Sequence, residues 1–175
     1  MGNNRSKKIV LSAVFCSLVF TMTWVSIPAP SVGNINLGDC MVILSGCLLG
    51  SWYGVAAGAL GAALCDLASG YVIYAPGTFI IKTLMVFVII LMKKFIIKSN
   101  KYILLIVSGT IAEVVMILGY FLYEAIILQY GLAAIMNVTF NAIQGVANLI
   151  VAVLLFAMLK KSGLLKIIFD DRRIK

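Results

Sequence analysis

Six long apolar runs, separated by short polar segments, account for most of this sequence. They cover about residues 9–27, 37–49, 53–67, 78–97, 102–128 and 138–159. Because an α-helix rises about 1.5 Å per residue, roughly 20 apolar residues cross a bilayer, so runs of this kind predict membrane spans. We therefore expect an all-α, polytopic membrane protein with six transmembrane helices, forming a single membrane domain over residues 1–175.

Proline and glycine mark the boundaries of the first three runs. Pro28 and Pro30 end the first run, and an outer loop of residues 29–36 follows. The second and third runs are short and are joined by a tight turn at residues 50–54. Glycines recur through both runs, at Gly46, Gly50, Gly54, Gly58 and Gly61. Small residues at such spacing let helices approach closely, so we expect these glycines to serve packing.

Polar side chains form a stripe along each of the last two runs. The sixth run carries amides at spacings of four, three and four: Asn137, Asn141, Gln144 and Asn148. At 100° per residue they fall within a strip about 60° wide. The fifth run carries Glu113, Tyr120 and Glu124 in a similar way. Polar groups are costly in hydrocarbon, so the two stripes predict a shared hydrated or ligand-filled pocket, with hydrogen bonds between helices as the alternative.

Charge predicts how the chain sits in the membrane. The sequence is 63% hydrophobic and 11% charged, with a mean hydropathy of +1.12, outside the soluble globular range. Thirteen of the 14 lysines and arginines lie in three patches, at residues 5–8, 93–101 and 160–175. The positive-inside tendency places all three in the cytoplasm, and hence both termini. We expect the net charge of +8 to meet anionic membrane lipid or a cytoplasmic partner, and not nucleic acid.

The remaining isolated polar residues fall in the outer half of the predicted spans. They favour a pocket open to the outside, because a channel or stand-alone secondary transporter also needs polar groups in the inner half. Lys82 either contacts a ligand or pairs with Asp66 or Glu113. Asp39 starts the second run, where we expect it to cap the helix. Tyrosines near this face form an interfacial belt or stack on a flat ligand: Tyr71, Tyr74, Tyr120 and Tyr123.

The sequence lacks the motifs of common catalytic and cofactor sites. It has no G-x-x-x-x-G-K-[ST] phosphate loop, no G-x-S-x-G elbow and no histidine, and its four cysteines lack metal-ligand spacing. We therefore expect no bound metal, no cofactor and no enzymatic activity. A membrane-embedded enzyme would have to use Asp66, Glu113 or Glu124 as acid–base groups.

Several segments follow one another in a recognisable order. They read IPAP at 27–30, INLGD at 35–39, LLGSWYG at 48–54, DLASGY at 66–71 and YAPGTFIIK at 74–82. In this order they resemble the substrate-binding S components of energy-coupling factor (ECF) vitamin transporters, over nearly the whole chain. The resemblance implies a six-helix subunit of the bacterial plasma membrane that binds a vitamin or vitamin precursor from outside.

The same resemblance implies partners and a ligand. Such a subunit works with a transmembrane coupling protein and two cytoplasmic ATPase subunits, which agrees with the missing phosphate loop. Small residues of Ala-x-x-x-Ala type on the first helix meet the coupling protein, and here the match is Ala13 and Ser17, with serine at the second position. The implied ligand is a pyridoxine-like or hydroxymethylpyrimidine-like heterocycle, or riboflavin.

The stripes and the resemblance together give one set of candidate substrate-binding residues. They are Asn36, Tyr74, Lys82, Glu113, Tyr120, Glu124, Asn137, Asn141, Gln144 and Asn148. Tyrosine faces and amide edges suit a small, flat, hydroxylated ring. The two glutamates favour a neutral or cationic ligand over one rich in carboxylates.

Overall fold

The computed structural model describes residues 2–28, 34–95 and 100–165. This part of the chain contains six α-helices: α1 (Gly2–Trp24), α2 (Gly38–Leu48), α3 (Trp52–Ala68), α4 (Ala75–Phe95), α5 (Lys101–Leu122) and α6 (Ala134–Lys161). Two short strands, β1 (Ser26–Pro28) and β2 (Asn34–Asn36), pair antiparallel between α1 and α2. A π-helix, η1 (Tyr123–Ile127), and a 3-10 turn, η2 (Gly131–Ala133), connect α5 to α6. The expected all-α fold with six helices is confirmed.

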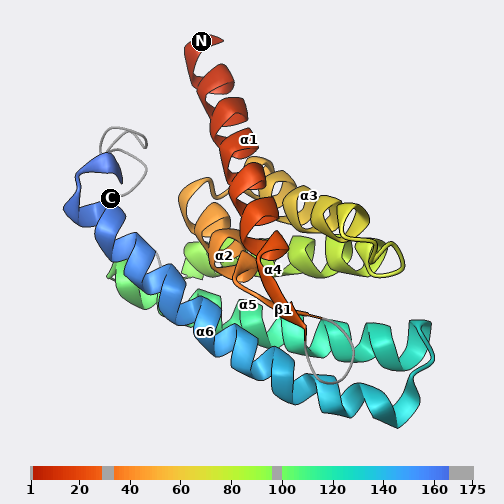
Figure 1. Ribbon diagram of the computed structural model, residues 1–175. Coiled ribbons are helices and arrows are strands. Elements are labelled where there is room, and N and C mark those ends of the chain that lie inside the picture. Colours follow the sequence, from red (N-terminus) through yellow and green to blue (C-terminus); the bar gives the residue numbers. More distant parts are fainter. Residues whose placement is uncertain (1, 29–33, 96–99, 166–175) are drawn as a thin grey trace.

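The short helix α2 lies at the centre of the bundle. Helices α1, α3, α4, α5 and α6 each pack against the next one in this series, and α2 contacts α1, α3, α4 and α6. Nine of the 11 residues of α2 are buried, as expected for a helix that is apolar on all sides. Both ends of the described chain lie toward one end of the bundle, and the α5–α6 connection lies toward the other (Figure 1).

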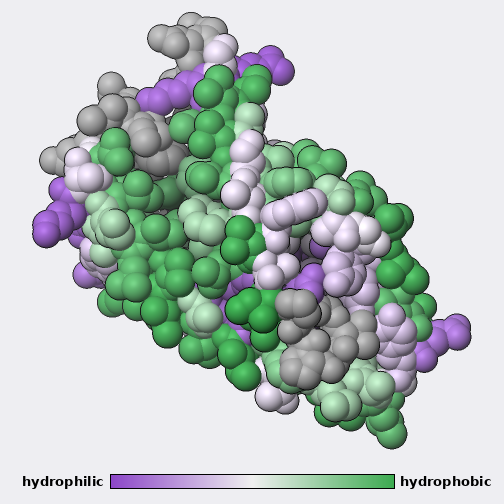
Figure 2. Space-filling view, viewed as in Figure 1, coloured by the Kyte–Doolittle hydropathy of each residue, from purple (hydrophilic) through white to green (hydrophobic). Residues whose placement is uncertain are grey.

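Four of the helices are long and apolar enough to span a bilayer. These are Arg5–Trp24, Ala75–Phe95, Lys101–Ile127 and Gly131–Lys161. We expected all six helices to cross the membrane, and α2 and α3 are shorter than the other four. At about 1.5 Å per residue, α2 covers only half of a hydrocarbon core of about 30 Å. Large apolar side chains are exposed along all four long helices. Figure 2 shows hydrophobic side chains over much of one face, with hydrophilic side chains at its ends and in a central region.

Several element boundaries differ from those expected. The first helix ends at Trp24 and not at residue 27, because residues 26–28 pair with 34–36 in a hairpin where only a loop was expected. Helix α4 begins at Ala75, three residues early, because Pro76 is tolerated in a first helical turn. Its expected end at residue 97 lies outside the described residues. Helix α6 begins at Ala134, four residues early.

The glycines of α2 and α3 allow close helix packing, as predicted. A Cβ atom added at Gly61 would lie 2.8 Å from Val19 Cβ on α1, and one at Gly54 would lie 2.7 Å from the Ser45 carbonyl oxygen on α2. Both distances are shorter than a van der Waals contact between heavy atoms. Gly50, at the turn between the two helices, has a φ of 54°, which a residue with a side chain adopts at a cost.

Candidate functional site

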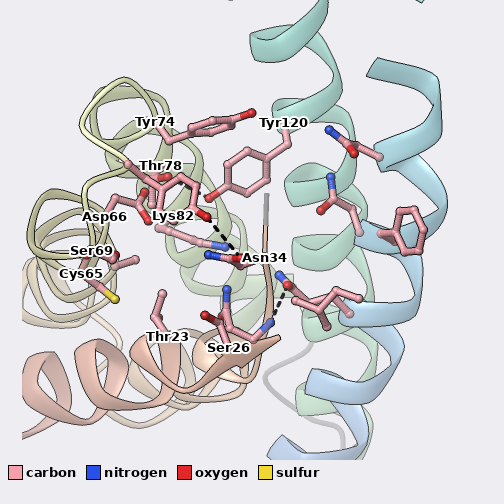
Figure 3. Close-up of a pocket in the computed structure, with 18 of the residues that line it drawn as sticks. Thr23, Ser26, Asn34, Cys65, Asp66, Ser69, Tyr74, Thr78, Lys82 and Tyr120 are labelled. Atoms are coloured by element: carbon pink, nitrogen blue, oxygen red, sulfur yellow. Dashed lines mark hydrogen bonds between the residues drawn. The ribbon is translucent and has the colours of Figure 1, made fainter. Parts of the chain in front are cut away.

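A pocket lies between the β1–β2 hairpin, the end of α3, the start of α4, the α5–η1 segment and the first half of α6 (Figure 3). Its empty space is about 800 Å³ with its open mouth included. Eight of the ten candidate binding residues line it: Asn36, Tyr74, Lys82, Tyr120, Glu124, Asn137, Asn141 and Gln144. Glu113 and Asn148 are not among its lining residues.

An ion pair between α2 and α4 lies at the base of the pocket. Lys82 Nζ donates to Asp39 Oδ1 at 2.5 Å, and the two side chains are only 6% and 1% exposed. The expected partners of Lys82, Asp66 and Glu113, are therefore corrected to Asp39. The expected helix cap is also wrong, because Leu37 occupies the N-cap of α2, and the first-turn N–H groups of Gly38 and Cys40 donate to Asn36 and Asn148 instead of Asp39. Asp39 points across the bundle because its charge is matched there.

Gln144 and Asn148 connect α6 to the hairpin and to α2. Gln144 Nε2 donates to Asp39 Oδ2 at 3.0 Å, and Gln144 Oε1 accepts from the backbone N–H of Asn36 at 2.9 Å. Asn148 Oδ1 accepts from the N–H of Cys40 at 2.8 Å, and Asn148 Nδ2 donates to the carbonyl oxygen of Asn36 at 2.9 Å. Asn148 is completely buried. For this residue the alternative interpretation, hydrogen bonding between helices, is the one the structure supports.

The far end of the pocket is built around Glu124. Asn137 Nδ2 donates to Glu124 Oε2 at 2.8 Å, and the Tyr74 hydroxyl lies 3.5 Å from Glu124 Oε1. Glu124 belongs to η1, where the wider π-helical turn changes the direction of side chains relative to α5. The carboxylate is 3% exposed and holds residues from η1, α4 and α6 together.

Tyrosines form one wall of the pocket. The hydroxyls of Tyr120 and Thr78 lie 2.9 Å apart, and Lys82 Nζ is 5.2 Å from the centre of the Tyr120 ring. Tyr74 contacts Tyr71 edge-on, with ring centres 6.3 Å apart. In Figure 3 the Tyr120 ring projects between the helices toward Lys82 and Thr78. Tyr123 lies outside this wall and donates to the carbonyl oxygen of Ile73.

Two side chains with a carboxylate or amide group in the pocket have polar atoms without a hydrogen-bond partner among the described residues. One is the side-chain amide of Asn141 on α6. The other is Asp66 Oδ2, at the end of α3, which is buried as an atom. Buried polar atoms are nearly always hydrogen-bonded in folded proteins, so the unpartnered Asp66 Oδ2 is unusual. The amide of Asn141 is partly exposed and free to bind a group in the pocket.

Glu113 lies on α5 against α6, away from the pocket lining. It is 5% exposed, and neither of its oxygens has a partner among the residues that the structure describes. A Cβ atom added at Gly145 would lie 3.1 Å from Glu113 Oε2, so the carboxyl group is packed directly against α6. In such surroundings an ionised carboxylate is costly, whereas a neutral carboxyl group is tolerated more easily.

The pocket also has lining residues that were not among the candidates. They include Thr23, Ser26, Asn34, Asp66, Ser69, Tyr71, Thr78 and Phe140. Asp66 and Tyr71 were noticed in the sequence, but neither belongs to a polar stripe, and they were therefore not included among the candidate binding residues. Thr23 lies at the end of α1, whereas Ser26 and Asn34 belong to the hairpin, where only a loop was expected. The described residues contain no group of three His, Cys, Asp or Glu side chains placed to hold a metal ion.

Comparison with known proteins decides the family. The family model for the S component of ECF-type riboflavin transporters matches residues 3–161. The chain belongs to this family. Among solved structures, this S component is similar to one described as "Structure and mechanism of the S component of a bacterial ECF transporter", at 20% identity and a TM-score of 0.73. The match covers 90% of this chain and 97% of the other, and it shows the same fold. Comparison with curated protein sequences gave no significant match.

The first helix of this S component presents its small residues outward. Ala13, Ser17 and Thr21 are exposed and line a shallow groove together with Val10, Val14 and Leu18. The opposite side of α1 packs on α3 through buried Phe15 and Val19. The small residues of α1 are therefore not packed against another helix in the described part of the chain, which was one of the two roles left open for them. The other role is contact with a partner membrane subunit.

Proposed function

We propose that this S component captures a vitamin or vitamin precursor from outside the cell, as the substrate-binding subunit of an ECF importer. The observation that carries the proposal is the pocket itself. Polar side chains from the hairpin and from α3, α4, η1 and α6 converge on it, and two of its groups, Asn141 and Asp66 Oδ2, lack partners in the described chain. A cavity with few fixed polar groups and aromatic walls is typical of small-molecule sites.

The lining favours a small flat heterocycle that carries hydroxyl or amino groups. The rings of Tyr74 and Tyr120 offer apolar faces for stacking, and Phe140 adds a third aromatic side chain. Asn141 can donate and accept at the edge of such a ring, whereas Asp66 Oδ2 can only accept when ionised. Pyridoxine-like and hydroxymethylpyrimidine-like compounds fit this pattern, as does riboflavin, the vitamin in the family's name.

The expected partners follow from the family and from α1. We propose that the groove at Ala13 and Ser17 docks on a transmembrane coupling protein, which in turn carries two cytoplasmic ATPase subunits. Small side chains let two helices approach closely in a membrane, and an exposed apolar groove lined by them suits another helix. The sequence has no phosphate loop, so the ATP-binding parts must come from other subunits.

The proposed orientation has both termini in the cytoplasm and the pocket open to the exterior. The basic patches at residues 5–8 and 160–161 lie on the same end of the bundle as the two chain ends (Figure 1). The hairpin and Glu124 belong to the segments that connect helices at the other end. A ligand arriving from outside would therefore meet the pocket directly.

A binding assay on purified protein tests the proposal. Thermal melting and native mass spectrometry across a panel of B vitamins and their precursors, without ATP, should reveal one heterocycle bound at one copy per chain. Replacing Asn141 by leucine should weaken that binding by at least about fivefold, because a ligand group then loses its partner. Thr139→Leu removes a polar group from the exposed side of the same helix and should leave affinity unchanged.

Two results would contradict the proposal. One is the absence of binding by every member of the panel. The other is ligand transport by the chain alone in liposomes that lack ATPase subunits, which would indicate a stand-alone transporter instead.

A further inference from the structure

Basic residues are almost absent from the part of the chain that builds the pocket. Between Lys8 and Lys93 the sequence has a single lysine or arginine, Lys82, and between Lys101 and Lys160 it has none. Residues 29–33, which the structure does not describe, carry no charge either. Whatever their placement, Lys82 is the only cationic side chain that these segments can offer to a ligand.

The side chain of Lys82 already forms an ion pair within the protein. Lys82 Nζ lies 2.5 Å from Asp39 Oδ1, and the other oxygen of Asp39 accepts from Gln144 Nε2 at 3.0 Å. Both charged side chains are buried. Drawing Lys82 away to another anion would leave the Asp39 carboxylate buried without its counter-charge, which is strongly unfavourable.

Carboxylates line the pocket where a ligand would lie. Asp66 reaches it from the end of α3, and its Oδ2 has no hydrogen-bond partner among the described residues. Glu124 reaches it from η1 and already accepts from Asn137. The formal charge of the lining is therefore one lysine against two carboxylates, before Asp39 is counted.

Helix N-termini are the other common binding sites for phosphate, and several first-turn N–H groups of α2 and α4 already have acceptors within the protein. At the start of α2 the N–H of Gly38 donates to Asn36 Oδ1 and the N–H of Cys40 donates to Asn148 Oδ1. At the start of α4 the N–H groups of Ala75 and Thr78 donate to backbone carbonyls, and Pro76 has no N–H. These donors are unavailable to a phosphate group.

We propose that the pocket accepts only the unphosphorylated form of its heterocycle, and that Asp66 and Glu124 determine this selectivity. A phosphate ester carries a charge of about −1.5 to −2 at neutral pH. In this pocket a phosphate group would lose its hydrating water and lie beside two carboxylates, with no unpaired cation to neutralise it. A hydroxyl or amino group at the same position instead donates to the unpartnered oxygen of Asp66. This inference rests on the proposed function, because it concerns the ligand of the same pocket.

Matched pairs of compounds test the selectivity. The dissociation constants of riboflavin and flavin mononucleotide, of pyridoxine and pyridoxine 5′-phosphate, and of hydroxymethylpyrimidine and its phosphate are measured by calorimetry on the purified protein at constant ionic strength. For the pair whose parent compound binds, the phosphate ester should bind at least about tenfold more weakly, because like charges meet in a site of low dielectric.

Variants then assign the selectivity to residues. Asp66→Asn and Glu124→Gln each remove one negative charge from the lining and should reduce the ratio between the two dissociation constants. Glu113→Gln makes the same chemical change at a carboxyl group outside the pocket lining, so it should leave the ratio unchanged and serves as the control. Binding of the parent compound confirms that each variant is folded, and the comparison in the unmodified protein needs no variant.

The outcomes separate this inference from the proposed function. Equal or tighter binding of a phosphate ester overturns the inference while the vitamin-binding role stands. A ratio unchanged in both Asp66→Asn and Glu124→Gln also overturns it. If neither member of any pair binds, the proposed function fails and the inference fails with it.

Discussion

At the scale of single residues, Asp39 holds three helices together. Its Oδ1 accepts from Lys82 of α4 and its Oδ2 from Gln144 of α6, while the residue itself lies in the first turn of α2. Removing one partner of a buried ion pair leaves the other charge uncompensated. The packing of these three helices, and with it the base of the pocket, therefore depends on this carboxylate.

Asp39→Asn should lower the free energy of unfolding by about 3–5 kcal/mol, because Lys82 is then buried without its counter-charge. Thermal melting in detergent measures the loss. Glu113→Gln makes the same chemical change at a buried carboxyl group that has no partner in the described chain, and its effect should stay within about 1 kcal/mol. Equal melting temperatures for Asp39→Asn and the unmodified protein would show that the pair contributes nothing.

Residue spacing within one helix could be predicted from the sequence, but partners across helices could not. The amides of α6 share a face because their spacing is helical, and three of the four line the pocket. The choice of Asp39 over Asp66 as the partner of Lys82 depends on how far α2 is displaced along α4. A single sequence contains no measure of that displacement.

At the scale of elements, patterns within one segment could again be predicted, whereas pairing between segments could not. The apolar runs predicted the six helices because each run has to bury or face hydrocarbon along its length. The hairpin was missed because Pro28 and Pro30 are read as helix breakers and give no sign of strand pairing. The π-helical turn at η1 was missed as well, since its residues continue the apolar pattern of α5. Both elements contribute lining residues to the pocket.

Helix α1 provides a test of assembly. Ala13→Leu should reduce co-purification with the coupling protein by several-fold, because the larger side chain fills the groove through which a partner helix would approach. Ligand affinity should not change, since Ala13 is not part of the pocket lining. Ala133→Leu, at an exposed position in η2, is the matched control. Unchanged recovery of the complex with Ala13→Leu would place the docking surface elsewhere.

At the scale of the whole molecule, the bundle has two ends with different properties. One end carries basic residues 5–8 and 160–161 and both ends of the described chain, and the other carries the hairpin, η1 and the open pocket. The short central helix α2 lies in the interior of the bundle, where nine of its 11 residues are buried. We therefore expect ligand binding to affect the pocket end, while α2 and the helices around it stay packed.

Hydrogen exchange should report this division. Adding the ligand should slow amide exchange in residues 34–36 and 71–78, which lie in or beside the pocket, because binding suppresses local opening. The α2–α3 turn at residues 49–52 should exchange at the same rate with and without ligand. Protection spread evenly over the chain would instead indicate that binding reorganises the entire bundle.

The contacts of Asn36 determine how mutations on α6 must be read. Both its backbone N–H and its carbonyl oxygen are held by side chains of that helix, Gln144 and Asn148 respectively. A substitution at Gln144 would consequently release strand β2 as well as removing a group from the cavity wall. Lost affinity in such a variant would combine two causes that no titration can separate, whereas Asn141, which anchors nothing else in the described chain, reports on recognition alone.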